Sequence, residues 1–226
     1  LPNLGIDYYL EYLLQKEKDQ PGMTYFLSVT GITEDEIYEV LNKVNASDFK
    51  GLTELNLSCP NVVGKPLTAY DFELVDKILT NVFRFFKKPL GVKLPAYFDQ
   101  AHFDYMANIL NQFPLQFVTC INSVAQGLWI NDETTAIKPN NGYGGIGGKY
   151  IKGTALANVH AFYKRLKPEI QIIGVGGVSS GRDAFEHILC GASLVQVGTS
   201  LPGRGPKAKI RQISDEVLAI MQDKGY

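Results

Sequence analysis

The chain has 226 residues, of which 45% are hydrophobic and 20% are charged, enough to bury one core. Lys and Arg number 22 against 23 Asp and Glu, a formal net charge of -1, so charge gives no reason to expect nucleic acid or an anionic membrane as a partner. No apolar run approaches the roughly 20 residues of a membrane span, and no signal segment opens the chain. Three cysteines do not make a disulfide framework, which predicts a cytoplasmic protein.

Six short apolar runs, rich in β-branched residues, alternate with segments of helical period. Each run is apolar nearly throughout, as a parallel strand covered by helices must be. The predicted strands are Tyr25–Thr30, Leu52–Ser58, Leu90–Leu94, Phe117–Asn122, Ile170–Val175 and Ser193–Val197.

The helical segments between these runs carry apolar stripes with a period of 3.6 residues. In the first of them, Thr33 and Glu36 have the spacing of a capping box. Alternating β and α segments predict an α/β fold, either an open doubly wound sheet or a (β/α)8 barrel. Six units fall short of the eight that close a barrel, and periodicity alone does not separate the two architectures. We expect a single domain over residues 1–226.

Polar residues follow or end several of the apolar strands. Asn56 lies near the end of the second strand, Lys93 lies inside the third, and the fourth ends at Asn122 with Ser123 directly after it. Functional residues of parallel α/β folds sit at the carboxyl ends of strands. A bound polar ligand would explain these side chains, since buried polar groups need partners. Loop capping is the competing explanation for either asparagine alone.

Glycine-rich turns follow the last two strands. Gly176-Gly177 precedes Ser179-Ser180-Gly181, which opens a helix, and Gly198-Thr199 follows the next strand. Glycine lets the backbone approach an anion, and the N–H groups at a helix start point at it. Each glycine pair alone is more often a plain turn, but on adjacent strands they favour a phosphate site.

Cys59 is the candidate base or nucleophile, because it follows a strand in a loop where a thiol is exposed and its pKa can be tuned. Cys120 and Cys190 fall within apolar segments and are predicted to be inert core residues. The three histidines share no spacing with each other or with a cysteine. The sequence therefore predicts neither a Cys–His hydrolase nor a His-ligated metal site.

The run Glu-Leu-Asn-Leu-Ser-Cys-Pro-Asn at 54–61 resembles dihydroorotate dehydrogenase, in particular the cytosolic class 1A enzymes. The likeness continues along the chain, with Gly-Val-Lys-Leu-Pro at 91–95, Gly-Gly-Ile-Gly-Gly at 144–148 and Asp-Ala-Phe-Glu-His at 183–187. The resemblance implies an FMN-dependent (β/α)8 barrel that oxidises dihydroorotate to orotate in pyrimidine synthesis. It further implies reoxidation by fumarate and a homodimer.

The resemblance also implies roles for individual residues. Cys59 matches the catalytic base. The substrate contacts are matched by Asn56, Asn61, Asn122 and Ser123. The FMN contacts are matched by Ser28, Asn56, Lys93, Ile121, Gly148, Gly176, Gly177, Gly198 and Thr199, the last four around the phosphate.

The family pattern has barrel strands before the position of Leu1, so we expect an N-terminally incomplete barrel of about six units, and we expect this chain alone to be inactive. Two other functions remain open. One is another flavin-dependent pyrimidine oxidoreductase, such as a dihydrouridine synthase, which would need a basic surface for tRNA. The other is a non-catalytic scaffold that binds FMN or phosphate and has no need of Cys59, Asn56 and Asn122 together.

Overall fold

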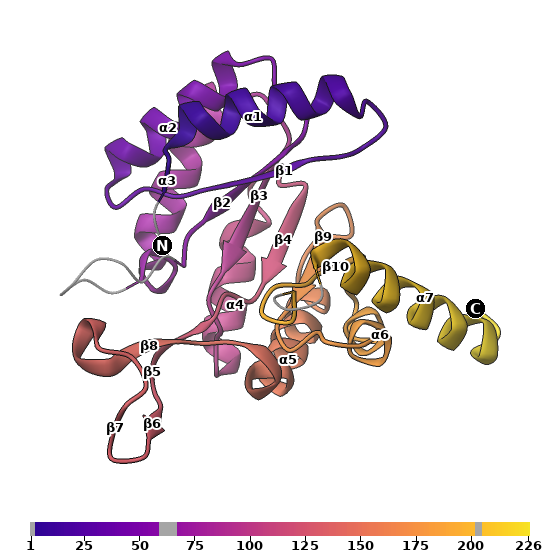
Figure 1. The fold of residues 1–226 in the computed structure, drawn as a ribbon. Coiled ribbons are helices and arrows are strands. Elements are labelled where there is room, and N and C mark those ends of the chain that lie inside the picture. Colours follow the sequence, from indigo (N-terminus) through magenta and orange to yellow (C-terminus); the bar gives the residue numbers. More distant parts are fainter. Residues whose placement is uncertain (1–2, 59–66, 202–204) are drawn as a thin grey trace. The chain divides into compact units, whose positions relative to one another are not determined.

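The computed structural model describes residues 3–58, 67–201 and 205–226 (Figure 1). Its contacts divide the chain into two compact units, each of which is described by itself. Unit 1 comprises Leu1–Lys93 and Asn108–Phe117, and unit 2 comprises Leu94–Ala107 and Val118–Tyr226.

Unit 1 contains three parallel strands in the order β1-β2-β3, with helices between them. The strands are β1 (Phe26–Val29), β2 (Leu52–Asn56) and β3 (Leu90–Leu94). The helices are α1 (Ile6–Asp19), α2 (Glu34–Ala46), the 3-10 turn η1 (Thr68–Tyr70) and α3 (Phe72–Phe85).

Helix α2 begins where its capping residues predict. The Glu36 N–H donates to the Thr33 hydroxyl at 3.2 Å, as in a capping box. The Glu36 carboxylate accepts from the Ile32 N–H at 2.6 Å, one residue before the cap, so the reciprocal half of the box is shifted. Both bonds satisfy amide groups around the helix start.

Unit 2 continues the alternation of strands and helices, with strands in the order β4-β9-β10. These are β4 (Phe117–Cys120), β9 (Gln171–Val175) and β10 (Leu194–Gln196). The helical elements are α4 (Gln100–Leu110), η2 (Pro139–Gly142), η3 (Gly148–Ile151), α5 (Lys152–Tyr163), α6 (Gly181–Leu189) and α7 (Pro206–Lys224).

A β-arm between β4 and η3 was not predicted. Strand β5 (Val124–Leu128) pairs antiparallel with β8 (Tyr143–Ile146), and β6 (Ile130–Asn131) pairs with β7 (Thr134–Thr135). Figure 1 shows this arm extending away from α5 and α6. It carries exposed apolar side chains, with Trp129 55% exposed.

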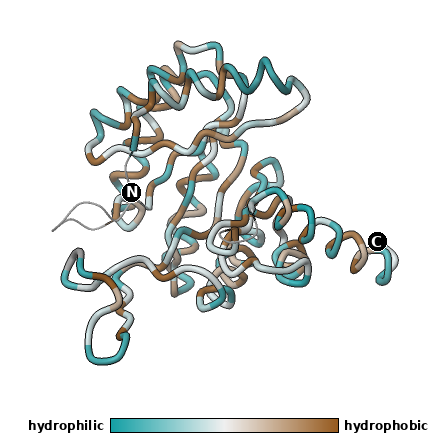
Figure 2. The backbone as a smooth tube through the Cα atoms, viewed as in Figure 1, coloured by the Kyte–Doolittle hydropathy of each residue, from teal (hydrophilic) through white to brown (hydrophobic). Residues whose placement is uncertain are grey.

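Each unit has its own apolar core, made by strands and the inner faces of helices. Figure 2 shows the helices changing between hydrophobic and hydrophilic along their turns, as amphipathic helices do. Buried core residues of unit 1 include Leu41, Val44, Phe49, Leu55, Ile78, Leu79 and Val82. Those of unit 2 include Leu94, Met106, Val118, Ala155, Val159, Phe162, Ile173 and Phe185.

The structure confirms the α/β class, and each of the six predicted strands is present within two residues of its predicted ends. The prediction for Cys120 is confirmed, because the residue is buried and burial raises the pKa of its thiol. The prediction for Cys190 as core is wrong, because it caps the end of α6 and is half-exposed. None of the described helices is long and apolar enough to cross a membrane.

Candidate active site

Four polar side chains share one face of the unit 1 sheet near the carboxyl ends of its strands. Ser28 on β1 lies directly beside Glu54 on β2, and Asn56 on β2 lies directly beside Lys93 on β3. Neighbouring residues in register point to the same face, and so do residues two apart on one strand. The structure therefore brings Ser28, Asn56 and Lys93 onto one face, as their predicted role requires.

Hydrogen bonds fix the amide of Asn56. Its Oδ1 accepts from the Ser58 N–H at 3.0 Å and from the Ser58 hydroxyl at 2.7 Å. The Thr30 hydroxyl donates to the Asn56 carbonyl at 3.0 Å. With Oδ1 engaged, the NH2 group is what Asn56 offers to a ligand, and it suits a carbonyl acceptor.

Lys93 is half-buried, and its main chain supports the same loop. The Lys93 carbonyl accepts from the Leu57 N–H at 3.1 Å, one residue beyond β2. The two strand ends are thus held together beyond the last paired residues. The position matches the expectation of a lysine set inside an apolar strand.

Glu54 is a charged residue of this face that sequence reasoning missed. Its side chain is 2% exposed, and the Ser28 hydroxyl donates to its Oε1 at 2.7 Å. A lone acid inside an apolar strand is the same signal that singled out Lys93. The buried Glu54 side chain therefore orients the Ser28 hydroxyl. If Ser28 contacts a flavin, it does so while its hydroxyl proton is donated to Glu54.

Two predicted residues, Cys59 and Asn61, lie outside the described residues. Ser58 is the last described residue before them, and it is 2% exposed. The roles of Cys59 and Asn61 therefore remain predictions from the resemblance.

In unit 2, the segment after β4 carries the predicted Ile121, Asn122 and Ser123. The Ile121 N–H donates to the Val175 carbonyl at 3.0 Å, and the Asn122 N–H donates to the Leu94 carbonyl at 2.9 Å. These bonds hold the segment after β4 beside the last residue of β9 and beside Leu94, which both belong to unit 2. Gly145 on the β-arm packs so closely on Ser123 that a Cβ at position 145 would overlap its side chain.

The two predicted glycine turns of unit 2 meet. The Ser200 hydroxyl donates to the Val178 carbonyl at 2.7 Å, which ties the turn after β10 to the turn after β9. Gly176 and Gly177 both have positive φ, at 128° and 76°, a conformation that L side chains rarely adopt. We call residues 176–178 and 198–200 the paired turns.

The start of α5 joins the same cluster. A Cβ at Gly177 would lie 2.5 Å from Lys152 Cβ, and one at Gly148 would lie 3.4 Å from the Thr199 methyl group. Gly148, at a φ of 71°, therefore packs against the second of the paired turns. The structure brings together all four residues predicted around a phosphate, together with Gly148.

At the start of α6 the N–H groups of Ser179, Ser180 and Gly181 already have partners within the protein, so the prediction that these amides are free for an anion is wrong. The Asp183 carboxylate accepts from the N–H groups of Ser179 and Ser180, each at 3.0 Å. The Gly181 N–H donates to Glu216 at 2.5 Å. A capping box formed by Ser180 and Asp183 thus occupies the helix start with the protein's own carboxylates.

Lys152, at the start of α5, forms ion pairs with two carboxylates of α6. Its ammonium lies 2.7 Å from Asp183 and 2.8 Å from Glu186, and hydrogen bonds to these carboxylates raise the pKa of Lys152. Burial alone would raise the pKa of Asp183, but the bonds from Lys152, Ser179 and Ser180 hold it well below its usual range. With two carboxylates beside it, Lys152 is a structural residue.

The positive φ values at Gly176 and Gly177 and the open space at Gly198 suit the close approach of a ligand to the backbone of the paired turns. At Gly198 a Cβ would meet nothing within 4 Å, so neither crowding nor a positive φ accounts for glycine there. Close approach of a ligand to the backbone does account for it. This backbone would suit the phosphate group of FMN, the cofactor that the resemblance implies.

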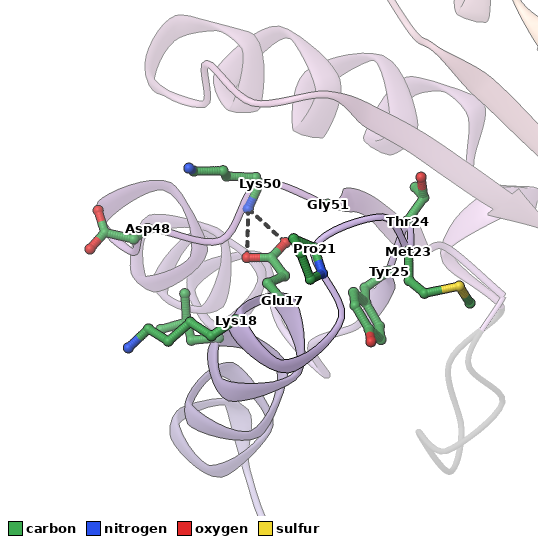
Figure 3. A pocket seen from close by; sticks show the side chains of 10 residues that line it. Glu17, Lys18, Pro21, Met23, Thr24, Tyr25, Asp48, Lys50 and Gly51 are labelled. Atoms are coloured by element: carbon green, nitrogen blue, oxygen red, sulfur yellow. Dashed lines mark hydrogen bonds between the residues drawn. The ribbon is translucent and has the colours of Figure 1, made fainter.

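Two cavities of unit 1 lie near the strands. One, of about 340 Å³, is lined by residues that precede β1 and β2, and Figure 3 shows the Glu17 carboxylate in it accepting from the Lys50 N–H at 3.0 Å. It lies at the amino ends of the strands, away from the predicted residues. The other, of about 560 Å³, runs along α1 and β1 and includes Ser28 in its lining.

Comparison with known proteins assigns a family. The sequence profile described as Dihydroorotate dehydrogenase matches residues 1–221. A protein of Streptococcus pneumoniae serotype 4 named probable dihydroorotate dehydrogenase A (fumarate) is 62% identical over the whole chain, which spans 72% of that protein. Putative dihydroorotate dehydrogenases A (fumarate) of Streptococcus uberis and Streptococcus agalactiae are 58% and 57% identical, and the chain spans 72% and 73% of their lengths. The chain belongs to the dihydroorotate dehydrogenase family, and the alternating strands and helices of its described residues have the α/β class of a (β/α)8 barrel.

Proposed function

We propose that this protein oxidises (S)-dihydroorotate to orotate and is reoxidised by fumarate, in the de novo synthesis of pyrimidine nucleotides (UMP). The names of relatives that are 62% and 58% identical support the substrate and the acceptor. The observation that carries the proposal is the polar face of unit 1, where Asn56 and Lys93 lie side by side at the ends of two apolar strands.

We propose FMN as the cofactor, which when bound accepts the hydride equivalent from the substrate. The glycine conformations of the paired turns and the open space at Gly198 support a phosphate-binding role. Residues that would hold FMN are Ser28, Asn56, Lys93, Ile121, Gly148, Gly176, Gly177, Gly198 and Thr199.

Oxidation of dihydroorotate removes a proton from C5 and a hydride from C6, so the site needs a base. We propose Cys59 as that base, since a thiolate accepts a proton near neutral pH when its pKa is lowered. Asn56, Asn61, Asn122 and Ser123 would orient the substrate by hydrogen bonds to its carbonyl, amide and carboxylate groups. The ammonium of Lys93 would stabilise negative charge that develops on the reduced cofactor.

The substitution Cys59→Ala tests the enzymatic proposal against a binding scaffold. We expect the variant of the purified holoenzyme to keep its flavin while orotate formation with fumarate falls at least about 100-fold, the usual contribution of a positioned base. Cys190→Ala, at a half-exposed cysteine on the end of α6, is the matched control and should keep full turnover. Unchanged turnover in Cys59→Ala would remove Cys59 as the base.

We further propose that residues 1–226 belong to one barrel domain and that the protein is a cytoplasmic homodimer, as the resemblance implies. The exposed apolar side chains of the β-arm, Trp129 among them, are compatible with an interface. Light scattering during size-exclusion chromatography should give twice the mass of one chain, and a monomer mass at micromolar concentration would contradict the dimer.

A further inference from the structure

His187 is a buried histidine that the proposed reaction does not use. It lies on α6 with 0% exposure, and its Nε2 lies 3.1 Å from the Gly176 carbonyl oxygen. On the other side the ring packs on the backbone of β9, because a Cβ at Gly174 would lie 2.5 Å from His187 Nδ1. The imidazole is therefore held between a strand and the first of the paired turns.

The contact between Nε2 and the Gly176 carbonyl determines the tautomer of the His187 ring. A carbonyl oxygen only accepts, so Nε2 carries the proton and donates to Gly176. Nδ1 is buried and has no hydrogen-bond partner among the described residues. Burial lowers the pKa of His187, so the ring is neutral near neutral pH.

The hydrogen bond from His187 to the Gly176 carbonyl also orients the Gly177 N–H, which belongs to the same peptide unit. The C=O of Gly176 and the N–H of Gly177 belong to one trans peptide unit, in which the two groups point in opposite directions. Holding the carbonyl inward on His187 turns the Gly177 N–H outward, away from the ring. Two successive glycines leave this peptide few other restraints, since both have positive φ and no side chain to anchor them.

We propose that His187 is a positioning residue, which fixes the Gly176–Gly177 peptide so that its outward amide binds the phosphate of the cofactor. The inference rests on the proposed function, because it assigns a partner to a phosphate site of the paired turns. It adds a buried neutral histidine to that site, acting through the backbone and without touching the ligand.

Two substitutions of similar size separate the effect of the Nε2 hydrogen bond on FMN binding from the effect of the ring's volume. His187→Gln keeps an N–H donor near the position of Nε2, whereas His187→Met has a similar shape and no donor. The holoenzyme is stripped of flavin, and the dissociation constants of FMN and riboflavin are measured by quenching of flavin fluorescence. Riboflavin lacks only the phosphate, so the ratio of the two constants reports the phosphate contact alone.

We expect His187→Met to lose about tenfold in FMN affinity, on the scale of one hydrogen bond, with riboflavin affinity nearly unchanged. His187→Gln should recover most of the FMN preference. Phe185→Leu, two residues earlier on α6 and also buried, is the control for general loosening of the helix and should leave the FMN-to-riboflavin ratio unchanged.

The outcomes distinguish the inference from the proposed function. If the unsubstituted protein binds riboflavin as tightly as FMN, the phosphate site fails and the inference fails with it. If it prefers FMN and His187→Met keeps that preference, only the inference is overturned. Should both His187 variants fail to fold, the nitrogen NMR signals of the unsubstituted ring decide, because a proton on Nδ1 rather than Nε2 would overturn the inference.

Discussion

At the scale of single residues, Asn158 shows how a buried amide organises the loop after β3. Its Oδ1 accepts from the Tyr97 N–H at 2.8 Å, and its Nδ2 donates to the carbonyls of Tyr97 at 3.1 Å and Thr154 at 2.9 Å. Asn158 is 1% exposed, so no solvent replaces these bonds when the amide is removed.

We therefore expect Asn158→Ala to lower the free energy of unfolding by about 2–4 kcal/mol, because it removes the buried hydrogen bonds of this amide to the backbone of Tyr97 and Thr154. Urea unfolding followed by circular dichroism measures the change. His160→Ala, on the exposed face of the same helix, should change it by less than about 0.5 kcal/mol. A loss below about 1 kcal/mol in Asn158→Ala would mean that the loop finds other partners.

Two glycines of the paired turns separate folding from cofactor binding. Gly198→Ala should leave the melting temperature of the flavin-free protein unchanged, because a Cβ there meets nothing within 4 Å, yet should weaken FMN binding. Gly177→Ala should lower both, since Gly177 has a φ of 76° and faces the Lys152 side chain at 2.5 Å. Unaltered FMN affinity in Gly198→Ala would show that the phosphate does not approach this turn.

The residues of the candidate site could be predicted in part from the sequence, because a polar residue inside or at the end of an apolar strand stands out. Asn56 and Lys93 were found in this way, and the register places them side by side. The bond between Ser28 and Glu54 could not be found, because it depends on which residues of β1 and β2 face each other.

At the scale of elements, the strands were predictable because buried parallel strands are apolar on both faces. Helix α1 was missed although Ile6, Leu10 and Leu13 repeat at helical spacing, since only Leu10 is fully buried and the stripe is weak. The β-arm was missed because none of the residues of β5 and β8 is buried, so these strands show no strict alternation of apolar and polar residues.

The sequence at the start of α6 fits both a capping box and an anion-binding site. Ser180 and Asp183 have the spacing of a capping box, and the same stretch of glycine and serine was interpreted as an anion site. The carboxylate three residues into the helix decides between them, because it reaches the same amides that a phosphate would use. A nearby acidic side chain at this spacing is therefore evidence against an anion site at a helix start.

Asp183→Asn tests this cap through its pH dependence. The pKa of Asp183 is lowered in the folded protein, so its carboxylate stabilises the fold above the unfolded value of about 3.9, and that contribution is lost as the pH falls below it. We expect Asp183→Asn to be about 2 kcal/mol less stable at pH 7 and the difference to shrink at pH 3. Asp215→Asn, at an exposed position of α7, is the control in urea unfolding. A difference that stays the same at both pH values would contradict an ionised cap.

At the scale of the whole molecule, the proposed activity draws on residues of both units. Ser28, Asn56 and Lys93 belong to unit 1, whereas the paired turns, Asn122 and Ser123 belong to unit 2. The proposed site residues are thus spread along the chain rather than confined to one motif. The family profile likewise matches nearly the whole chain, over residues 1–221.

The two half-reactions of the flavin test the central claim most directly. The holoenzyme is mixed with dihydroorotate in the absence of oxygen, and the visible absorbance of the oxidised flavin is followed before and after fumarate is added. We expect the absorbance to fall with dihydroorotate and to return with fumarate. A bound flavin that keeps its absorbance with dihydroorotate would contradict the proposed dehydrogenase and leave a flavin-binding protein with a different substrate or none.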